Sequence, residues 1–482
     1  MNASVLERIF SLRMAVAVAI LLTELMFLAN RLDAGLSLVL SSAAVTLALL
    51  LQLRFAVRAG AATPGDIAVF VFNWLFLDLA PKVQLASVSQ QLVNTSSATE
   101  DGVALTNLVC ALYIVAFTCF YAALTARASS PPPTGSTADE ARVEFTGGGI
   151  GITVLICIGV VGALAPLAYH SVNDQAEITP MALILNRYLL FLPSAALLIL
   201  LQETLRNPRK LWFTRACVLT LLTVLLLITE NPYVEKRNAL GPLYLCLILV
   251  AFQGWFNSRT RRMLLLIGGM VLIFPAISIF THNKDQSVLD VTLTQVSDRI
   301  VEYYDSINYD AWANVYSSVE IVARHGCQWG HQLLGSVLFF VPSSVWTDKP
   351  LASGIFIARY LINNYGMWFT NLSAPLVAEA YLDFSWVGVI LYAGLLALLV
   401  NFLNTLALQR NRWVNAPLAL YGSMFLMFMM RGSLMVAMGF ASAAFLSFVT
   451  ASALLSMKLG IRRGTLMPDA APGPVLSTSP QR

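Results

Sequence analysis

Apolar runs of about 20 residues recur along the chain, and they constrain its fold more than any other feature. A helix needs roughly 20 apolar residues to cross the core of a lipid bilayer. Such runs lie near 14–30, 35–53, 66–81, 103–124, 149–169, 181–202, 213–229, 240–257, 263–280, 384–407, 413–430 and 433–456. The pattern predicts an all-α polytopic membrane protein with about 12 transmembrane helices.

The composition excludes the main alternatives to a membrane protein. Only 12% of the residues are charged and 57% are hydrophobic, whereas an ordinary soluble domain carries about 25% charged residues. A soluble enzyme, a disordered scaffold and a collagen-like fibre are therefore excluded. No basic stretch is typical of a nucleic-acid surface. The six cysteines show no metal-ligand spacing, so we expect no metal site.

The distribution of basic residues predicts the orientation. Cytoplasmic loops are enriched in Lys and Arg. With the N-terminus inside, about 18 of the 30 basic residues fall on the cytoplasmic side, so both termini are expected in the cytoplasm. The predicted regions are nine spans in 1–280, a periplasmic loop at 281–383, three spans in 384–456 and a disordered cytoplasmic tail at 457–482.

The periplasmic loop has its own periodicity. Apolar residues recur at steps of three and four over 293–307 and again over 312–322, and Gly326 follows the second series. This spacing predicts two amphipathic helices that lie on the membrane or over a cavity. The apolar stretch 333–345 is too short to span the bilayer, so it predicts a re-entrant or interfacial segment.

Polar motifs in and near this loop resemble those of a known family. They are 328–336 (QWGHQLLGS), 339–350 (FFVPSSVWTDKP), 371–375 (NLSAP) and 379–388 (EAYLDFSWVG), preceded by 73–84 (NWLFLDLAPKVQ) and by Asn231-Pro232 with Arg237. In this order they resemble the oligosaccharide repeat-unit polymerases of the O-antigen (Wzy-type) class. Two positions depart from the family pattern: Ser343 stands where the family has Arg, and Ser385 where it has Gly.

The resemblance implies a glycosyltransferase of the bacterial inner membrane with its active site facing the periplasm. Such an enzyme polymerises undecaprenyl-diphosphate-linked oligosaccharide repeat units for O-antigen or a related surface polysaccharide. A sugar hydroxyl attacks C1 of the chain on the lipid, and the lipid diphosphate leaves. No cofactor is implied. The implied partners are the lipid-linked oligosaccharide, membrane lipids, and a chain-length regulator and flippase of the same pathway.

This reaction indicates which side chains to consider. Fixed cations stabilise a leaving group that carries charge, and arginine binds phosphate oxygens in a bidentate manner. The expected substrate-binding residues are Arg187, Arg237, Lys349, Arg359, Asn371 and Arg431. The candidates for a catalytic base are His331, Glu379 and Asp310, with His325 as a further alternative.

Several of these residues have a structural alternative. Asp310 precedes the second amphipathic helix and could act as its N-cap. Arg187 lies within the sixth predicted span, where an arginine can extend to the interface. Glu24 lies alone in the first span and is expected to make a helix–helix hydrogen bond. Asp78 and Lys82 are four residues apart and can pair.

Two other functions remain open from the sequence. An O-antigen ligase would use the same chemistry to move a finished glycan to another acceptor. A polytopic transporter or flippase of lipid-linked glycans would also suit about twelve spans with both ends inside. Transporters commonly contain matching halves and paired broken helices, and the sequence shows neither.

Overall fold

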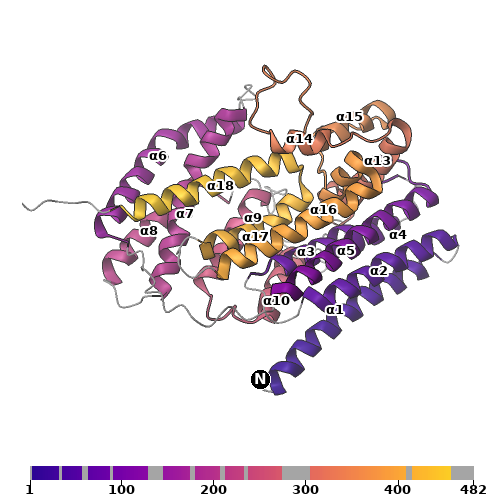
Figure 1. Ribbon diagram of the computed structural model, residues 1–482, viewed down its shortest axis with the longest axis horizontal. Coiled ribbons are helices and arrows are strands. Elements are labelled where there is room, and N and C mark those ends of the chain that lie inside the picture. Colours follow the sequence, from indigo (N-terminus) through magenta and orange to yellow (C-terminus); the bar gives the residue numbers. More distant parts are fainter. Residues whose placement is uncertain are drawn as a thin grey trace, which may run out of the picture.

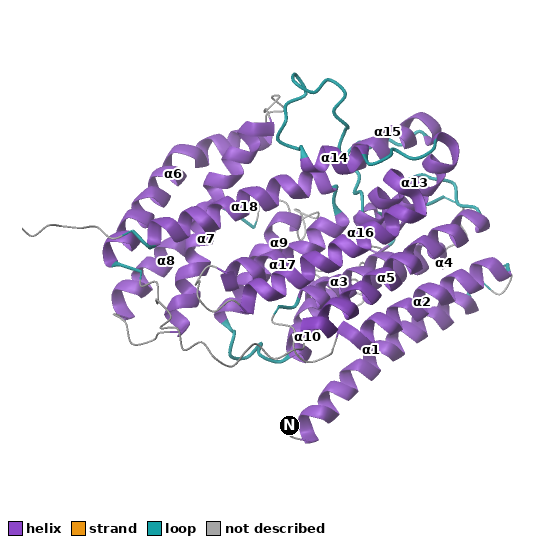
Figure 2. Cartoon of the chain, in the orientation of Figure 1, coloured by secondary structure: helices purple, strands orange, loops and turns teal. Residues whose placement is uncertain are grey.

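The computed structural model describes residues 3–31, 35–56, 63–86, 91–128, 145–173, 180–206, 212–232, 237–273, 304–408 and 415–457. Over these ranges the regular structure consists of helices, and no strand is present (Figure 2). This confirms the all-α expectation. The predicted tail, apart from its first residue Met457, lies outside the described residues.

Seven helices in the described part of the chain are long and apolar enough to cross a membrane. They are α1 (Ala3–Ala29), α2 (Leu36–Ala56), α5 (Glu100–Ala128), α6 (Gly147–Asn173), α7 (Pro180–Arg206), α16 (Leu376–Leu408) and α18 (Leu434–Leu455). Shorter apolar helices are α8 (Trp212–Thr229), α9 (Arg237–Ala251) and α17 (Asn415–Arg431). The fold is therefore that of a multi-pass α-helical membrane protein.

Two expected spans differ in their details. The span expected at 66–81 consists of α3 (Gly65–Trp74), a π-helical turn η1 (Leu75–Leu79) and α4 (Ala80–Ala86). The ninth span begins with α10 (Arg259–Gly268) and continues as the π-helical turn η2 (Gly269–Ile273), and the rest of it lies outside the described residues. Hydrophobic periodicity locates a helix but does not reveal a π-turn, which occurs mostly as a single turn at a functional position.

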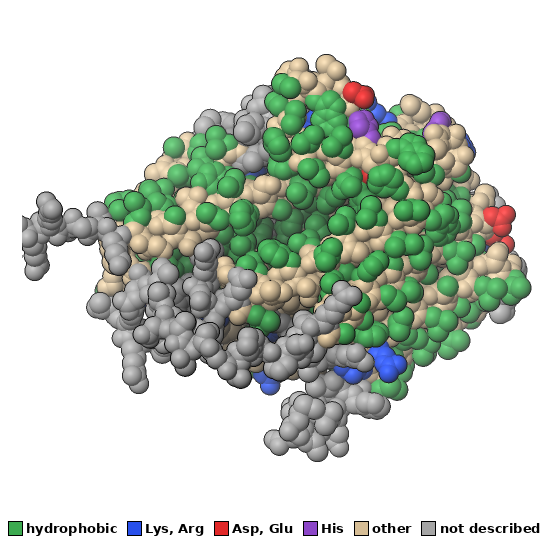
Figure 3. All heavy atoms as spheres, viewed as in Figure 1, with side chains coloured by type: hydrophobic (Ala, Val, Ile, Leu, Met, Phe, Trp, Pro, Cys, Tyr) green, Lys and Arg blue, Asp and Glu red, His purple; other side chains and the backbone are tan. Residues whose placement is uncertain are grey.

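The helices pack side by side into one bundle (Figure 1). α5 packs between α2 and α16, and α18 packs along α7. Three helices of the expected periplasmic loop, α13 (Ala311–His325), α14 (His331–Val337) and α15 (Ser353–Tyr365), gather at one end of the bundle, away from the N-terminal end of α1 (Figure 1). The face seen in Figure 3 is largely apolar along the helices, and its charged side chains lie near the edges.

The segment expected in the periplasm follows its predicted pattern only in part. The helix predicted over 312–322 is confirmed as α13, which ends at Gly326 with a φ of +79°. Its amphipathic placement on a surface is not confirmed, because the polar Asn314, Ser317 and Ser318 are buried as well. The first predicted helix lies mostly outside the described residues, and its end forms the 3-10 turn η4 (Ile307–Tyr309). The stretch 333–345 is not one continuous helix, because α14 ends at Val337 and turns follow, with Pro342 among them.

A sharp kink divides α16 where the expected span begins. Phe384 and Ser385 have non-helical dihedral angles, and Ser385 has φ 53° and ψ −136°. The two parts of the helix approach so closely that a Cβ on Gly388 would lie 1.9 Å from the carbonyl oxygen of Ala380. The residues before the kink, including Glu379 and Asp383, thus form a separate buried segment at the end of the bundle.

The kink gives a first prediction. The conformation of Ser385 is one that glycine adopts without steric cost, and glycine is the residue of the resembling family at this position. We expect Ser385→Gly to raise the free energy of unfolding by about 1 kcal/mol, and Ser385→Val to lower it. Thermal unfolding of the purified variants in detergent measures both changes. A stability loss in Ser385→Gly would contradict the strain inferred here.

Candidate functional site

Several of the predicted site residues lie around the first two turns of α18. Glu379 of α16 accepts a hydrogen bond from the Leu434 amide at 2.9 Å. The Arg187 guanidinium of α7 lies over the Phe440 ring, 5.4 Å from its centroid. α14 packs against α18 so closely that a Cβ on Gly335 would lie 2.8 Å from the Met435 side chain. The structure thus brings α7, α14 and α16 together around α18.

Glu379 is buried at this junction. Its Oε1 atom binds the first amide of α18, where the helix dipole favours a carboxylate. Its Oε2 atom is buried and has no hydrogen-bond partner among the described residues. Next to it, Ser433 Oγ accepts a hydrogen bond from the Gly354 amide at 2.8 Å, which joins the start of α15 to the same turn. Because Glu379 is fully buried, its visible role is to hold the α17–α18 turn, and its role as a base stays a prediction.

Asp383, one helical turn after Glu379, is a site residue that the sequence analysis did not single out. Its carboxylate accepts hydrogen bonds from the Gln332 and Leu333 amides at 3.0 and 2.9 Å and from the Tyr392 hydroxyl at 2.5 Å. The two amides belong to the first turn of α14. Asp383 therefore fixes the helix on which His331 is the first residue. Its spacing of four residues from Glu379 was the available signal, since such residues share a helix face.

Asp383 holds the helix that carries His331, and two contacts of the His331 side chain itself fix the orientation of its ring. Its Nε2 atom lies 3.0 Å from the carbonyl oxygen of Asp348, and its ring meets the Trp346 ring edge-on at 6.0 Å. A carbonyl oxygen only accepts hydrogen bonds, so Nε2 must carry the proton of this bond. In the neutral ring, Nδ1 then carries the lone pair. The His331 side chain is 32% exposed, so a ligand can reach this ring.

Lys349 closes the exposed loop between α14 and α15, which protrudes at the top of Figure 2. Its ammonium donates hydrogen bonds to the carbonyl oxygens of Phe339 and Val341 at 2.7 and 2.8 Å. Partial burial lowers the pKa of the Lys349 side chain. Lys349 thus stabilises the loop that also contains Asp348, whose carbonyl oxygen accepts the hydrogen bond from His331. Its contact with a phosphate stays a prediction.

Arg431, the last residue of α17, lies against an aromatic stack. Its guanidinium is 5.7 Å from the centroid of Phe76 in the π-turn η1, and Phe76 stacks on Tyr309 at 4.7 Å. Its Nε atom is buried and has no hydrogen-bond partner among the described residues. Arg431 therefore has an unused donor three residues before Leu434, on the same turn that Glu379 holds.

Arg187 lines a small open pocket between α7, α17 and α18. Phe191, Tyr421 and Phe440 form its apolar walls, and Glu230 adds an acidic group. The pocket thus offers a cation, a carboxylate and aromatic surface to a ligand. A simple extension of Arg187 to the interface is not required, because its guanidinium lies over a ring inside the bundle.

The other predicted residues lie elsewhere or serve other contacts. Asp310 is at the N-cap position of α13 but does not cap it; its carboxylate accepts hydrogen bonds from Asn314 and from the Ser373 amide and hydroxyl. Arg359 and Asn371 are exposed. Arg237 begins α9, and its side chain lies outside the described part of the structure. The substrate-binding roles assigned to Arg237, Arg359 and Asn371 remain predictions.

Comparison with known proteins leaves this site without a precedent to follow. No protein-family model matches the chain, and neither a curated protein nor a solved structure matches it. The class that the fold defines is an α-helical multi-pass membrane protein with a polar cluster at one end of its bundle.

Proposed function

We propose that the chain is a glycosyltransferase of the bacterial inner membrane that polymerises undecaprenyl-diphosphate-linked oligosaccharide repeat units on the periplasmic face. The observation that carries the proposal is the environment of His331. One ring nitrogen is held by a backbone carbonyl, the helix beneath the ring is fixed by Asp383, and the ring is accessible at the end of the bundle. A histidine held this way suits general-base catalysis. The order of the polar motifs is the second support.

The reaction assigns a role to each group. Nδ1 of neutral His331 takes the proton of the acceptor sugar hydroxyl as its oxygen forms a bond to C1 of the donor chain. The bond from C1 to the phosphate oxygen breaks, and the lipid diphosphate leaves with the electron pair. Arg187 and Arg431 stabilise that charge, because a guanidinium binds phosphate oxygens with two parallel donors. The exposed Trp329, two residues before His331, offers a flat apolar face to a sugar ring.

The orientation belongs to the same proposal. We place both termini in the cytoplasm, with about twelve spans and α13–α15 in the periplasm. Its support is the distribution of basic residues together with the position of α13–α15 away from the N-terminal end of α1 (Figure 1). A cysteine introduced at the exposed Thr347 should react with a membrane-impermeant maleimide added to intact spheroplasts, measured against native Cys157, which is buried. Labelling only after lysis would show that Thr347 faces the cytoplasm, and the proposed orientation would be wrong.

The function is tested on a lipopolysaccharide gel. In a deletion strain we expect the ladder to collapse to core plus one repeat, because ligation of single repeats continues without polymerisation. Loss of every repeat-bearing band would instead indicate a ligase or a flippase. An unchanged ladder, with every other surface polysaccharide also unchanged, would exclude the polymerase.

Complementation tests the cations. Arg431→Ala should fail to restore the ladder although the protein accumulates in the membrane, while Arg431→Lys should restore part of it, since lysine keeps the charge without the bidentate fork. Arg54→Ala is the matched control, because Arg54 is exposed in the last turn of α2. A full ladder in Arg431→Ala would show that Arg431 does not stabilise the leaving diphosphate.

A further inference from the structure

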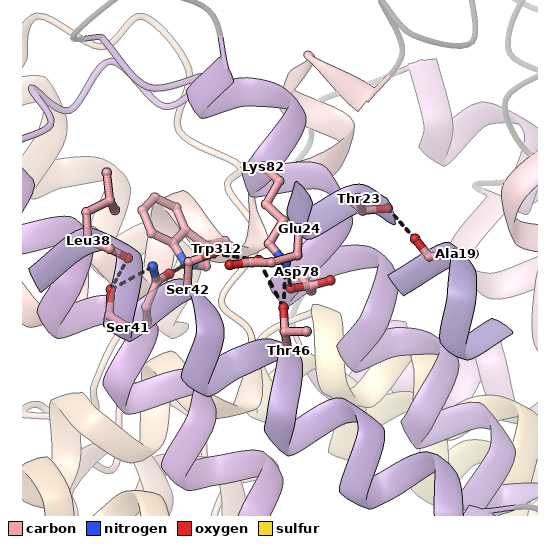
Figure 4. A network of polar contacts seen from close by, with 11 residues as sticks. Ala19, Thr23, Glu24, Leu38, Ser41, Ser42, Thr46, Asp78, Lys82 and Trp312 are labelled. Carbon is pink, nitrogen blue, oxygen red and sulfur yellow. Dashed lines mark hydrogen bonds and ion pairs between the residues drawn. The ribbon is translucent and has the colours of Figure 1, made fainter. Parts of the chain in front are cut away.

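A second polar cluster lies within the bundle, formed by Glu24 of α1, Asp78 of the π-turn η1 and Lys82 of α4 (Figure 4). The Lys82 ammonium is 2.7 Å from Glu24 Oε2 and donates a hydrogen bond to Asp78 Oδ1. The expected Asp78–Lys82 pair is confirmed. Glu24 is not alone, because α1 packs its carboxylate against the same ammonium.

The cluster is closed to solvent and is not electrically balanced. Glu24, Asp78 and Lys82 are 6%, 1% and 6% exposed. One ammonium faces two carboxylates, so the ionised cluster carries one uncompensated negative charge. Burying such a charge is costly, and a buried group is commonly neutralised instead. No second Lys, Arg or His of the described residues lies within 4.0 Å of either carboxylate.

Two carboxylate oxygen atoms of the cluster accept no hydrogen bond from the described residues, and we call them bare. Glu24 Oε2 accepts from the hydroxyls of Ser42 and Thr46 at 2.8 and 3.0 Å, and Lys82 also donates to Thr46 at 2.9 Å. Glu24 Oε1 and Asp78 Oδ2 are buried and have no hydrogen-bond partner in the described part of the chain. Each of the two carboxylates thus has one saturated oxygen beside Lys82 and one oxygen that can accept a proton without breaking a hydrogen bond.

The surrounding elements add no other charge to the cluster. α2 contributes Ser42 and Thr46, and α5 contributes Asn107, whose carbonyl oxygen accepts from Trp312 Nε1 of α13 at 3.1 Å. At the end of α1, Arg31 donates to the carbonyl oxygen of Leu85. Among the described residues, the charged groups in direct contact within the cluster are therefore those of Glu24, Asp78 and Lys82.

We propose that Glu24 and Asp78 form a proton-binding site that holds one shared proton at neutral pH. The proton adds to a bare carboxylate oxygen and makes the cluster neutral; no other bond changes. Two bare oxygens beside an ammonium are too few and too close to a positive charge to hold a metal cation in place of the proton. Asp78 and Lys82 line a small pocket together with Ser42 and Asn107.

The site differs from the proposed active site and does not rest on the proposed function. It lies in the bundle on α1, η1 and α4, whereas His331 lies on α14. Asn107, which lines the same pocket, accepts a hydrogen bond from Trp312 Nε1 of α13 at 3.1 Å.

Infrared difference spectroscopy of the purified full chain in lipid nanodiscs tests the proposal. At neutral pH the wild type should show the carbonyl stretch of a protonated carboxylic acid. Glu24→Gln and Asp78→Asn should each lower the intensity of this band by that of one acid group, because either variant leaves one carboxylate balanced by Lys82. The buried Glu379 is unchanged in both variants, so any contribution it makes to the band stays constant. Asp101→Asn is the matched control, since Asp101 is exposed on α5, and it should keep the band.

Three results would overturn the proposal. They are a wild type without the acid band, an acid band of unchanged intensity in Glu24→Gln or in Asp78→Asn, and a loss of one group's intensity when Na⁺ is added at constant pH. Two independent variants keep the test decisive if one of them does not fold. The acid band is measured on the purified protein, so the outcome for the proton site does not depend on whether the variants form polymer.

Discussion

Replacing His331 with alanine is expected to abolish the polymer ladder in a complemented deletion strain, while the protein accumulates at the wild-type level. A positioned general base contributes roughly a factor of 10² to 10⁴ to the rate, so its loss leaves too little activity to extend a chain. His331 is partly exposed and makes one side-chain hydrogen bond, to the Asp348 carbonyl, so the fold should tolerate the change.

A second variant separates catalysis from positioning. Glutamine at 331 can still donate a hydrogen bond to the Asp348 carbonyl, but it has no group that takes a proton at neutral pH. His331→Gln should therefore lack polymer as completely as His331→Ala. His325→Ala tests the alternative base: His325 ends α13 and contacts Tyr360 of α15, and we expect this variant to keep the ladder. A normal ladder in His331→Gln would show that His331 only holds the loop.

The class of fold could be predicted from the sequence because it depends on local patterns. Apolar runs are enough to locate membrane helices, and steps of three and four are enough to place α13. The break at Phe384 and Ser385 appeared only as the start of an expected span, since a kink depends on a few dihedral angles rather than on hydropathy. The π-turn η1 was missed for the same reason.

The site could be predicted only residue by residue. His331 and Glu379 were named because their motifs resemble those of a family, yet the link between them depends on contacts between α14, α16 and α18. Glu24 and Lys82 are 58 positions apart, so no local spacing could reveal their ion pair. Such contacts are set by tertiary packing, and sequence periodicity carries information on single elements.

Asp383 gives the prediction with the largest expected effect on stability. Asp383→Ala leaves the amides of Gln332 and Leu333 and the hydroxyl of Tyr392 without their acceptor. A buried donor left without a partner costs about 1–3 kcal/mol, so we expect a loss of about 4 kcal/mol in the free energy of unfolding. Thermal unfolding in detergent measures it, and faster amide exchange in α14 locates it.

Two further variants separate the contributions to that loss. Tyr392→Phe removes one donor and keeps the two bonds to α14, so it should cost about 1 kcal/mol and leave polymer formation intact. Asp101→Asn changes an exposed carboxylate on α5 and should change neither quantity. If Asp383→Ala unfolded like the wild type, α14 would not depend on this carboxylate. Because His331 begins the helix that Asp383 holds, the loss of polymer in Asp383→Ala should follow the loosening of α14 even at temperatures where the rest of the bundle stays folded.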